Sequence, residues 1–466
     1  MINEFFERDI YKELTEWAQE ESNYALYLRG PRQVGKTSIL EKLGDEHFDV
    51  FVYIDLRVKG EAQKFEERLH YHKEQFGYSK FDHKHGPMWE LVFREYEPKY
   101  TNNAKSLVVI DEIQESVAAY NSIRSIRRSL KSKFAVTGSY LGIISRYKDY
   151  NMPAGDVQFA EMSSLTFVEF LRANNVWDEY SQIKTFNHME MNDAGQAICE
   201  KVRELYRTYC QIGGYPDVVR EWVTHGNMDK CKKVTARLLE SFYGESSSYF
   251  EEVVGRSLWG RTLAKVAASM VTKLGDLDIS LAKEGFRNDD ALGLEIRRRD
   301  RVNALKWLDD CHIIGTVPIY DGLESVASIS NKSLFFFRDM GLMTQLCEDS
   351  ELVLPSDLAG IYAENFVYLH LLDEAGKFFV GNEVHSFSGT WGQIDFVMRN
   401  KQLGRCGIEV KHGSGGTKSG DKALADGKID YLIRVQDTYG SVSDKQATIP
   451  IFMLDKLGLI VSARMR

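Results

Sequence analysis

The chain is 466 residues long, and its 59 basic and 68 acidic side chains give a formal net charge of −9. This length exceeds what one ordinary hydrophobic core supports, so we expect about three domains. The negative charge argues against a large electrostatic footprint on nucleic acid, although local basic patches stay compatible with it.

The sequence also argues against membrane and secreted classes. No apolar run is long enough to span a bilayer, and Glu4, Glu7 and Asp9 interrupt the N-terminus, which does not resemble a signal peptide. The six cysteines are scattered without a C-x-x-C pair, which favours reduced thiols and argues against a zinc ribbon. We therefore expect a cytoplasmic protein with no membrane partner.

The first predicted elements surround a glycine-rich motif. Residues 5–19 have the pattern of an amphipathic helix, 24–28 of a short buried strand, and 38–43 of the first turns of a helix. Between the strand and the second helix the chain reads G-x-x-x-x-G-K-T, the phosphate-binding loop of nucleotide hydrolases. The residues of this loop are Gly30, Pro31, Arg32, Gln33, Val34, Gly35, Lys36, Thr37 and Ser38.

The chemistry of this loop follows from its residue types. A strand, a tight glycine loop and a helix start direct backbone N–H groups and a helix N-terminus toward a polyphosphate. We expect Gly30 and Gly35 to permit close backbone approach, and Lys36 to reach the β- and γ-phosphates. The hydroxyl of Thr37 is the expected ligand of Mg²⁺. Because all the fixed positions are present after a predicted strand, nucleotide binding is favoured over a chance match.

A second strand with functional residues follows further along. Residues 107–110 are apolar and run into Asp111 and Glu112. This pattern is typical of a buried parallel strand that ends at the active-site edge of a sheet. We expect Asp111 to hold Mg²⁺ through its water shell and Glu112 to polarise the attacking water.

Two further strands complete the predicted nucleotide domain. Residues 50–56 form one of them, and residues 134–139 form the other, which ends in small polar residues. Thr137 or Ser139 either senses the γ-phosphate by hydrogen bonding or belongs to an ordinary turn at the strand end. Both alternatives stay open from the sequence.

With these motifs in place, the chain resembles a family of prokaryotic AAA-type ATPases fused to a C-terminal domain of unknown function with a restriction-endonuclease-like core. The resemblance extends over nearly the whole chain. It implies an additional-strand P-loop fold, ATP as the nucleotide, and an α-helical lid after the sheet. It rests on residues 30–37, 111–114, 137–139, 165–170, 213–216 and 339–342.

One position departs from the family pattern. Relatives often carry a glycine followed by an arginine after the strand at 134–139, whereas this chain has Gly155 and Asp156. A role that relatives give to that arginine cannot be transferred. Four nearby arginines are alternatives for stabilising transition-state charge, in cis or across a subunit interface, although exposed helical arginines are more often solvated surface residues. They are Arg124, Arg127, Arg128 and Arg146.

The middle of the chain is predicted to hold two modules. Residues 165–255 read as mostly helical, with a break at 213–216 that marks a turn between helices. Residues 256–330 read as a winged helix-turn-helix with a wing at 313–318. The basic run at 297–301 suits phosphate contacts to DNA at the start of its third helix. The alternative is a module that docks on the ATPase or on a partner and touches no DNA.

A second chemical signal lies near the C-terminus. Asp395 is followed, after a polar turn, by Glu409, Val410 and Lys411. Strand residues two apart face the same side, so Glu409 and Lys411 point together while Asp395 on the neighbouring strand lies beside Glu409. Two carboxylates and the Val410 carbonyl are hard oxygen ligands for Mg²⁺, and Lys411 would orient water and offset charge on a scissile phosphate. This pattern resembles the restriction-endonuclease-like superfamily, in which a helical glutamate, here Glu364, often completes the site.

We therefore predict an α/β protein with a P-loop parallel sheet and helical lid, then a winged helix, then a restriction-endonuclease-like α/β domain. The expected boundaries are 1–164 for the ATPase core, 165–255 for the lid, 256–330 for the winged helix and 331–466 for the nuclease-like domain.

The leading hypothesis is an ATPase, using ATP and Mg²⁺, whose cycle controls metal-dependent cleavage of nucleic acid, with DNA as the first candidate. The expected catalytic residues are Glu112, Glu364, Asp395, Glu409 and Lys411. The expected metal ligands are Thr37, Asp111, Asp395 and Glu409.

One alternative is a regulatory ATPase switch whose silent nuclease-like fold binds a partner or DNA. A protein-remodelling ATPase ranks last, because no aromatic-glycine pore loop is evident. The activity of the second site and a homo-oligomeric state stay open.

Overall fold

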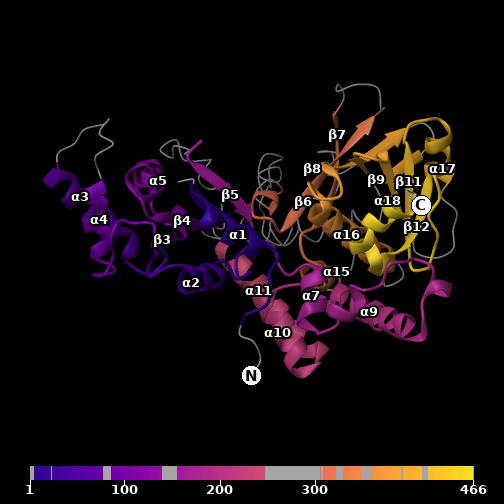
Figure 1. Ribbon diagram of the computed structural model, residues 1–466, viewed down its shortest axis with the longest axis horizontal. Coiled ribbons are helices and arrows are strands. Elements are labelled where there is room, and N and C mark those ends of the chain that lie inside the picture. The colour runs from indigo at the N-terminus through magenta and orange to yellow at the C-terminus, as the bar shows by residue number, and fades with distance from the viewer. Residues whose placement is uncertain are drawn as a thin grey trace, which may run out of the picture. The chain divides into compact units, whose positions relative to one another are not determined.

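The chain divides into two units, which are described separately. In the computed structural model the described residues are 5–21, 24–76, 86–138, 155–246, 305, 308–321, 329–348, 358–389, 392–411 and 418–464. The first unit comprises Met1–Ser163 with Asp310–His312, and the second comprises Ser164–Asp309 with Ile313–Arg466. Figure 1 labels their elements along the chain.

Five parallel strands form the sheet of the first unit, in the order β2-β3-β4-β1-β5. β4 lies between β1, which leads into the glycine loop, and β3, which ends at the acidic pair. β4 is therefore the additional strand that the family resemblance implied, and it corresponds to the strand predicted at residues 134–139. The strands are β1 (Ala25–Arg29), β2 (Val50–Asp55), β3 (Ser106–Asp111), β4 (Lys133–Gly138) and β5 (Val157–Glu161).

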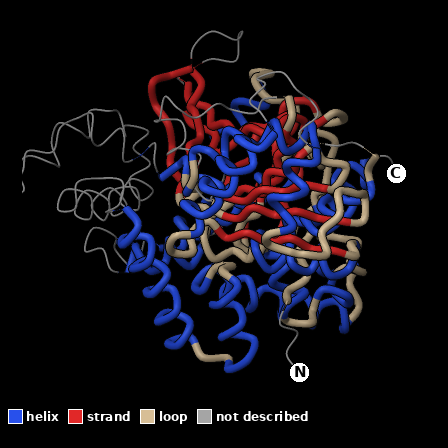
Figure 2. The backbone as a smooth tube through the Cα atoms, turned by 90° about the vertical axis from the view of Figure 1, so that its left-hand side faces the viewer, coloured by secondary structure: helices blue, strands red, loops and turns tan. Residues whose placement is uncertain are grey.

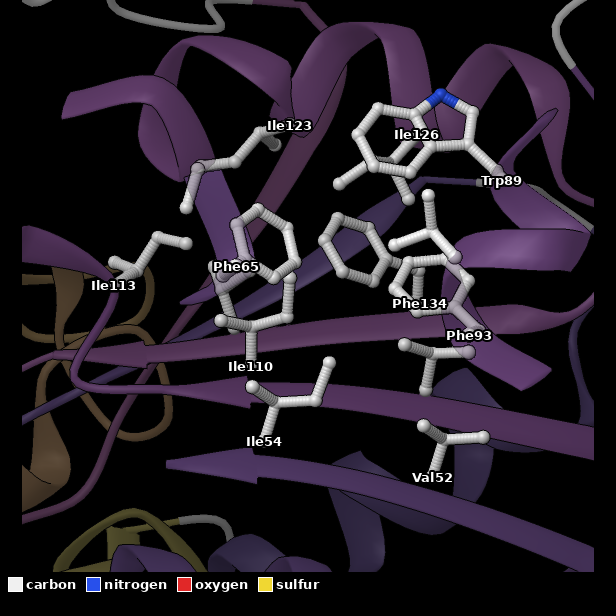
Figure 3. Close-up of a cluster of buried hydrophobic side chains, with 14 of the residues drawn as sticks. Val52, Ile54, Phe65, Trp89, Phe93, Ile110, Ile113, Ile123, Ile126 and Phe134 are labelled. Atoms are coloured by element: carbon white, nitrogen blue, oxygen red, sulfur yellow. The ribbon is translucent and has the colours of Figure 1, made fainter. Parts of the chain in front are cut away.

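Helices cover this sheet because its inner strands β3 and β4 are buried on both faces at every residue. Figure 3 shows one face, where side chains such as Ile54 and Ile110 from the strands meet Phe65, Trp89 and Ile123 from the helices above. The phosphate loop connects β1 to α2, and the acidic pair lies at the end of β3. The helices of the unit are α1 (Ile10–Gln19), α2 (Lys36–His47), α3 (Glu61–Phe76), α4 (Gly86–Arg94), η1 (Ile113–Glu115) and α5 (Val117–Ser129).

The second unit begins with a helical region, as predicted for residues 165–255 up to the described end at 246. Thr166 caps the first of these helices by accepting the backbone N–H of Glu169, whose side chain accepts the N–H of Thr166 in return. The elements are α7 (Phe167–Ala173), α8 (Trp177–Tyr180), η2 (His188–Glu190), α9 (Asp193–Ile212), α10 (Pro216–His225) and α11 (Met228–Ser246).

A seven-stranded mixed sheet follows, in the order β12-β11-β10-β9-β8-β6-β7. β8, β9 and β10 form an antiparallel meander, and β11 and β12 continue the sheet in parallel with β10. Figure 2 colours strands red and helices blue, which separates the two kinds of element along the backbone. The strands are β6 (Ile314–Asp321), β7 (Ile329–Phe337), β8 (Val380–Gly389), β9 (Gly392–Asn400), β10 (Gly404–Lys411), β11 (Tyr431–Gln436) and β12 (Gln446–Pro450).

Five further helical elements belong to the second unit within the described residues. α16 packs against β8 and β10, while α17 packs against β9, β10 and β11. Ala423 of α17 joins an apolar cluster with Ile394 of β9 and Leu432 of β11, which fixes this helix over these strands. The elements are α15 (Met340–Glu348), α16 (Leu358–Glu374), α17 (Lys418–Ala425), η3 (Ile451–Lys456) and α18 (Gly458–Arg464).

The segment predicted as a lid, residues 165–255, falls in the second unit as far as it is described. The reason is packing. The ring of Phe167 meets that of Phe366 at a centroid distance of 5.3 Å, and the backbone N–H of Gly214 donates to the carboxylate of Asp339 at 2.9 Å. α9 and α11 also pack against α15. A lid built only onto the ATPase sheet would not share these contacts.

The segment predicted as a wing, residues 313–318, belongs to the seven-stranded sheet and not to a separate winged-helix module. It contributes β6, which pairs in parallel with β8 and antiparallel with β7 inside the seven-stranded sheet. The expected boundary at residue 330 therefore falls within β7. Most of the predicted winged helix, namely 256–304, 306–307 and 322–328, lies outside the described residues, as does the basic run at 297–301.

Two simpler expectations can be compared with the structure. None of the helices in the described ranges is long and apolar enough to cross a bilayer. All six cysteines are buried and free of disulfide bonds.

Candidate functional site

The phosphate loop has the backbone that its glycines predict. Gly30 and Gly35 have φ angles of 151° and 96°, and Gln33 between them has a φ of 61°. A Cβ placed on Gly30 would lie 2.0 Å from the carbonyl oxygen of Met162, which follows β5. The loop therefore passes against the neighbouring strand at a spacing that only glycine permits.

Lys36 lies inside this loop. It is buried, and its Nζ donates to the carbonyl oxygens of Gly30 at 3.0 Å and Pro31 at 2.7 Å. The ammonium is held among the loop carbonyls at the start of α2. A cation at a helix N-terminus beside backbone N–H groups is suited to a polyphosphate.

Arg8 is hydrogen-bonded to the phosphate loop, a role that was not predicted from the sequence. It is buried, and its guanidinium donates to the Val34 carbonyl at 3.0 Å and to the Ser163 carbonyl at 2.6 Å. Arg8 precedes α1 and thereby links the segment before the sheet to the phosphate loop and to the end of β5. No local feature of the sequence indicates this role, because Val34 and Ser163 are both distant from Arg8 along the chain.

Asp111 is the centre of the hydrogen bonds at the sheet edge. Its Oδ2 accepts from the hydroxyls of Thr37 and Tyr53, both at 2.7 Å, and its Oδ1 accepts from the hydroxyl of Thr137 and from the N–H of Glu112. Burial on its own would raise the pKa of Asp111, but the hydrogen bonds from Thr137, Thr37 and Tyr53 outweigh it and hold that pKa below its ordinary value. The carboxylate is therefore kept ionised.

These contacts bring together the predicted metal ligands Thr37 and Asp111. A hydroxyl and an ionised carboxylate 2.7 Å apart are the hard oxygen donors that Mg²⁺ prefers, so the residues fit this ion. Thr137 was predicted either to sense the γ-phosphate or to lie in a turn, and in the structure its hydroxyl is engaged with Asp111. Ser139 lies outside the described residues. Tyr53, at the end of β2, was not predicted from the sequence.

Glu112 follows at a sharp corner between β3 and η1, where its backbone is left-handed with φ 50° and ψ 50°. It is buried, its Oε2 accepts from the Gln114 amide at 2.5 Å, and its Oε1 lies 3.8 Å from the guanidinium of Arg57. The predicted base thus lies next to the predicted metal-binding carboxylate and has polar neighbours on both carboxylate oxygens.

Three of the four arginines that were alternatives for stabilising transition-state charge form ion pairs with one buried acid. Arg124, Arg127 and Arg128 pair with Asp156 at 2.8, 3.5 and 3.1 Å. Asp156 immediately precedes β5, at the sheet edge opposite the phosphate loop. These guanidinium groups are therefore far from a nucleotide bound in the same chain. Arg146 lies outside the described residues.

The second site is built on β9 and β10. The two strands pair from Asn400 with Gly404 to Phe396 with Ile408, and beyond this pair Asp395 Oδ2 accepts the N–H of Val410 at 2.8 Å. Asp395 therefore lies beside the segment that carries Glu409 and Lys411, as the alternation of strand residues predicts.

Glu409 is buried beneath α17, with an exposed fraction of only 2%. A Cβ on Gly420 of that helix would lie 2.7 Å from Glu409 Oε1, so the helix backbone passes directly over the carboxylate. Arg434 is the parallel neighbour of Glu409 on β11, and its guanidinium is bonded to Asp421 of α17 and to Gln446.

Glu364 lies on α16, as predicted, and this helix packs against β10. Across the described ranges, no three Asp, Glu, His or Cys side chains gather into a group that could hold a metal ion. The structure thus brings Asp395 next to the Glu409 segment without making Glu364 the third member of such a group. The role of Glu364 stays a prediction.

Family models match two parts of the chain. One is described as an AAA domain and matches residues 22–171, which contain the phosphate loop and the acidic pair. This part of the chain is an AAA-type P-loop domain. The other is described as a domain of unknown function (DUF8612) and matches residues 203–352, from α9 to the region after α15. Glu364, Asp395, Glu409 and Lys411 lie outside both ranges.

Other comparisons add little. No curated protein matches the chain. Among solved structures, the chain is similar to the Aeropyrum pernix ORC1 protein in complex with DNA, at 16% identity and a TM-score of 0.26 over 74% of this chain and 93% of that one. It is also similar to the Thermotoga maritima RuvB Holliday junction branch migration motor, at 12% identity and a TM-score of 0.26 over 67% and 91%. TM-scores this low support no statement about fold or function.

Proposed function

We propose that the AAA-type domain binds and hydrolyses ATP, and that its nucleotide cycle controls a metal-dependent nuclease site in the second unit. Nucleic acid, with DNA as the first candidate, is the proposed substrate of that site. The observation that carries the first part is the convergence of Thr37, Tyr53 and Thr137 on the ionised carboxylate of Asp111, beside the phosphate loop.

The residues of the loop have distinct proposed roles. The loop N–H groups and Lys36 bind the phosphates, and Thr37 and Asp111 would hold Mg²⁺. The ion would offset negative charge on the phosphate oxygens. Glu112 orients the attacking water and accepts its proton. Each role uses a side chain at the carboxyl edge of the parallel sheet, where ligands bind in such folds.

Loss of the loop lysine tests the ATPase. Lys36→Ala removes the ammonium that would neutralise the phosphates, so we expect ATP turnover to fall by about 100-fold or more. Steady-state phosphate release from the full chain measures this. Lys42→Ala is the matched control, because Lys42 lies on the same helix and pairs with Glu46 at 3.8 Å, away from the loop. Equal turnover in both variants would contradict the site assignment.

The nuclease proposal rests on the hydrogen bond between Asp395 and the Val410 N–H, which places one carboxylate beside the backbone that carries Glu409 and Lys411. Asp395 and Glu409 would hold the metal, and Lys411 would orient water near the scissile phosphate.

Asp395→Ala tests this site. We expect it to abolish cleavage of mixed single- and double-stranded DNA and RNA while ATP turnover persists. Lys401→Ala is the control, because Lys401 is exposed in the turn between β9 and β10. Cleavage that survives Asp395→Ala would show that the site is elsewhere.

A second candidate is a regulatory ATPase switch in which the nuclease-like site is silent. The burial of Glu409 beneath Gly420 of α17 favours it, because a covered carboxylate offers little access to a metal and a polymer. A shift to larger assemblies on addition of ATP, with no cleavage of any substrate, would support this function over the first.

A further inference from the structure

Gln114 contacts the proposed base from two residues further along the chain. Glu112 has a left-handed backbone, and a residue other than glycine holds this conformation only where its surroundings enforce it, since it costs on the order of 1 kcal/mol. Ile113 supplies one restraint, because its side chain is part of the buried cluster of Figure 3. The N–H of Glu112 supplies another, through its bond to Asp111.

The carboxylate is restrained as well. The Gln114 amide donates to Glu112 Oε2 at 2.5 Å, and both side chains are buried. A hydrogen bond from a neutral amide to a buried carboxylate is charge-assisted and directional, so it selects one orientation of the group. Arg57 faces the other oxygen, at 3.8 Å and half exposed to solvent, and so restrains it less.

Gln114 is in turn placed by the end of β4. A Cβ on Gly138 would lie 2.6 Å from Gln114 Oε1 and 3.1 Å from the hydroxyl of Tyr27. The missing side chain at Gly138 therefore makes room for the amide. Thr137, the preceding residue of β4, donates to Asp111. One strand end thus orients both acids, Asp111 directly and Glu112 through Gln114.

We propose that Gln114 is a positioning residue for ATP hydrolysis, which holds the carboxylate of Glu112 in the orientation it needs to take a proton from the attacking water. The inference rests on the proposed ATPase function. Gln114 itself touches neither nucleotide nor water in this scheme and acts only through Glu112.

Gln114→Met is the direct test, since methionine keeps the length of the side chain and removes the donor. A misoriented base loses part of the rate gain from proton transfer, so we expect kcat to fall about tenfold or more with KM for ATP unchanged. A second variant, Gly138→Ala, displaces the amide without changing its chemistry and should lower kcat in the same way. ATP binding and thermal unfolding of each variant verify that it is folded.

A double-variant cycle separates positioning from general support of the fold. In a Glu112→Gln chain, Gln114 has no base to orient, so adding Gln114→Met should leave the residual rate unchanged. An equal fall in both backgrounds, an unchanged kcat, or a raised KM alone would overturn the inference. Absence of Lys36-dependent hydrolysis in the wild-type chain would overturn the proposed ATPase as well, and the two failures are thereby told apart.

Discussion

At the residue scale, the nucleotide site depends on how Asp111 is hydrogen-bonded. Four donors meet its two oxygens, and three of them come from different elements, α2, β2 and β4. These bonds outweigh the effect of burial and hold the pKa of Asp111 below its ordinary value, so the group is ionised in the folded chain at neutral pH. A missing donor should therefore weaken the site without removing it.

Tyr53→Phe tests this dependence. The hydroxyl donates to a charged group, so its loss should weaken Mg²⁺-dependent ATP binding by about tenfold and leave Mg²⁺-free binding nearly unchanged. Titration of a fluorescent ATP analogue with and without Mg²⁺ measures both. Tyr11→Phe is the matched control, because the Tyr11 hydroxyl also donates to a carboxylate, that of Glu46, on helices away from the edge. Equal effects of the two substitutions would contradict the account.

His370, on α16 of the second unit, predicts a pH dependence of stability. Burial lowers its pKa from 6.5 to about 4. Between these values the unfolded chain binds a proton that the folded chain does not, so the free energy of unfolding falls as the pH drops through this window. The full effect is about 3 kcal/mol. Denaturant unfolding at pH 7 and pH 4.5 measures it. His370→Gln should lose clearly less stability over the same interval, and an identical loss would contradict the assignment.

At the scale of elements, the turn between α9 and α10 is locked to the start of α15. Asp339 is buried and accepts the N–H groups of Gly214 at 2.9 Å and Leu342 at 3.0 Å. Gly213 has a φ of 70°, and a Cβ there would lie 2.3 Å from Asp339 Oδ1. The two glycines and the aspartate, which are far apart in the sequence, thus form one joint.

Two alanine substitutions separate this contact from backbone strain. Gly213→Ala and Gly226→Ala both introduce a side chain at positive φ, but a Cβ on Gly226 meets nothing within 4 Å. We expect Gly226→Ala to cost about 1 kcal/mol and Gly213→Ala at least about 2 kcal/mol more, because Asp339 must move. Thermal or denaturant unfolding of the second unit measures the difference. Equal costs would show that strain alone matters there.

The sequence predicts those elements whose signal is local. β1, the phosphate loop and β3 were placed from an apolar run, a glycine spacing and two acids, and the pair Asp395 and Glu409 from strand alternation. Tyr53, Gln114 and Arg8 could not be found this way, because their roles depend on which strands and loops become neighbours. The bond from Arg8 to Ser163, for instance, joins residues 155 positions apart.

The same limit explains the differences at the scale of the whole molecule. The segment 313–318 reads as a wing from its own residues, whereas the membership of β6 in the seven-stranded sheet is decided by pairing with β8, more than sixty residues further along. Likewise, nothing in the local sequence of the helices predicted as a lid indicates which part of the chain they pack against. Phe167 and Phe366 meet only once both parts are folded.

We propose two chemistries in two units, with ATP turnover in the first, phosphodiester cleavage in the second, and control of the second by the first. The chain offers one lysine in each site, Lys36 and Lys411, whose loss should silence one chemistry and leave the fold intact.

The most direct measurement is metal-dependent cleavage of mixed DNA and RNA, with and without ATP, by the wild-type chain, Lys36→Ala and Lys411→Ala. We predict cleavage that needs Lys411, changes with ATP in the wild type and no longer responds to ATP in Lys36→Ala. Absence of cleavage under every condition, with Lys36-dependent ATP turnover intact, would contradict it and leave the second unit as a binding module.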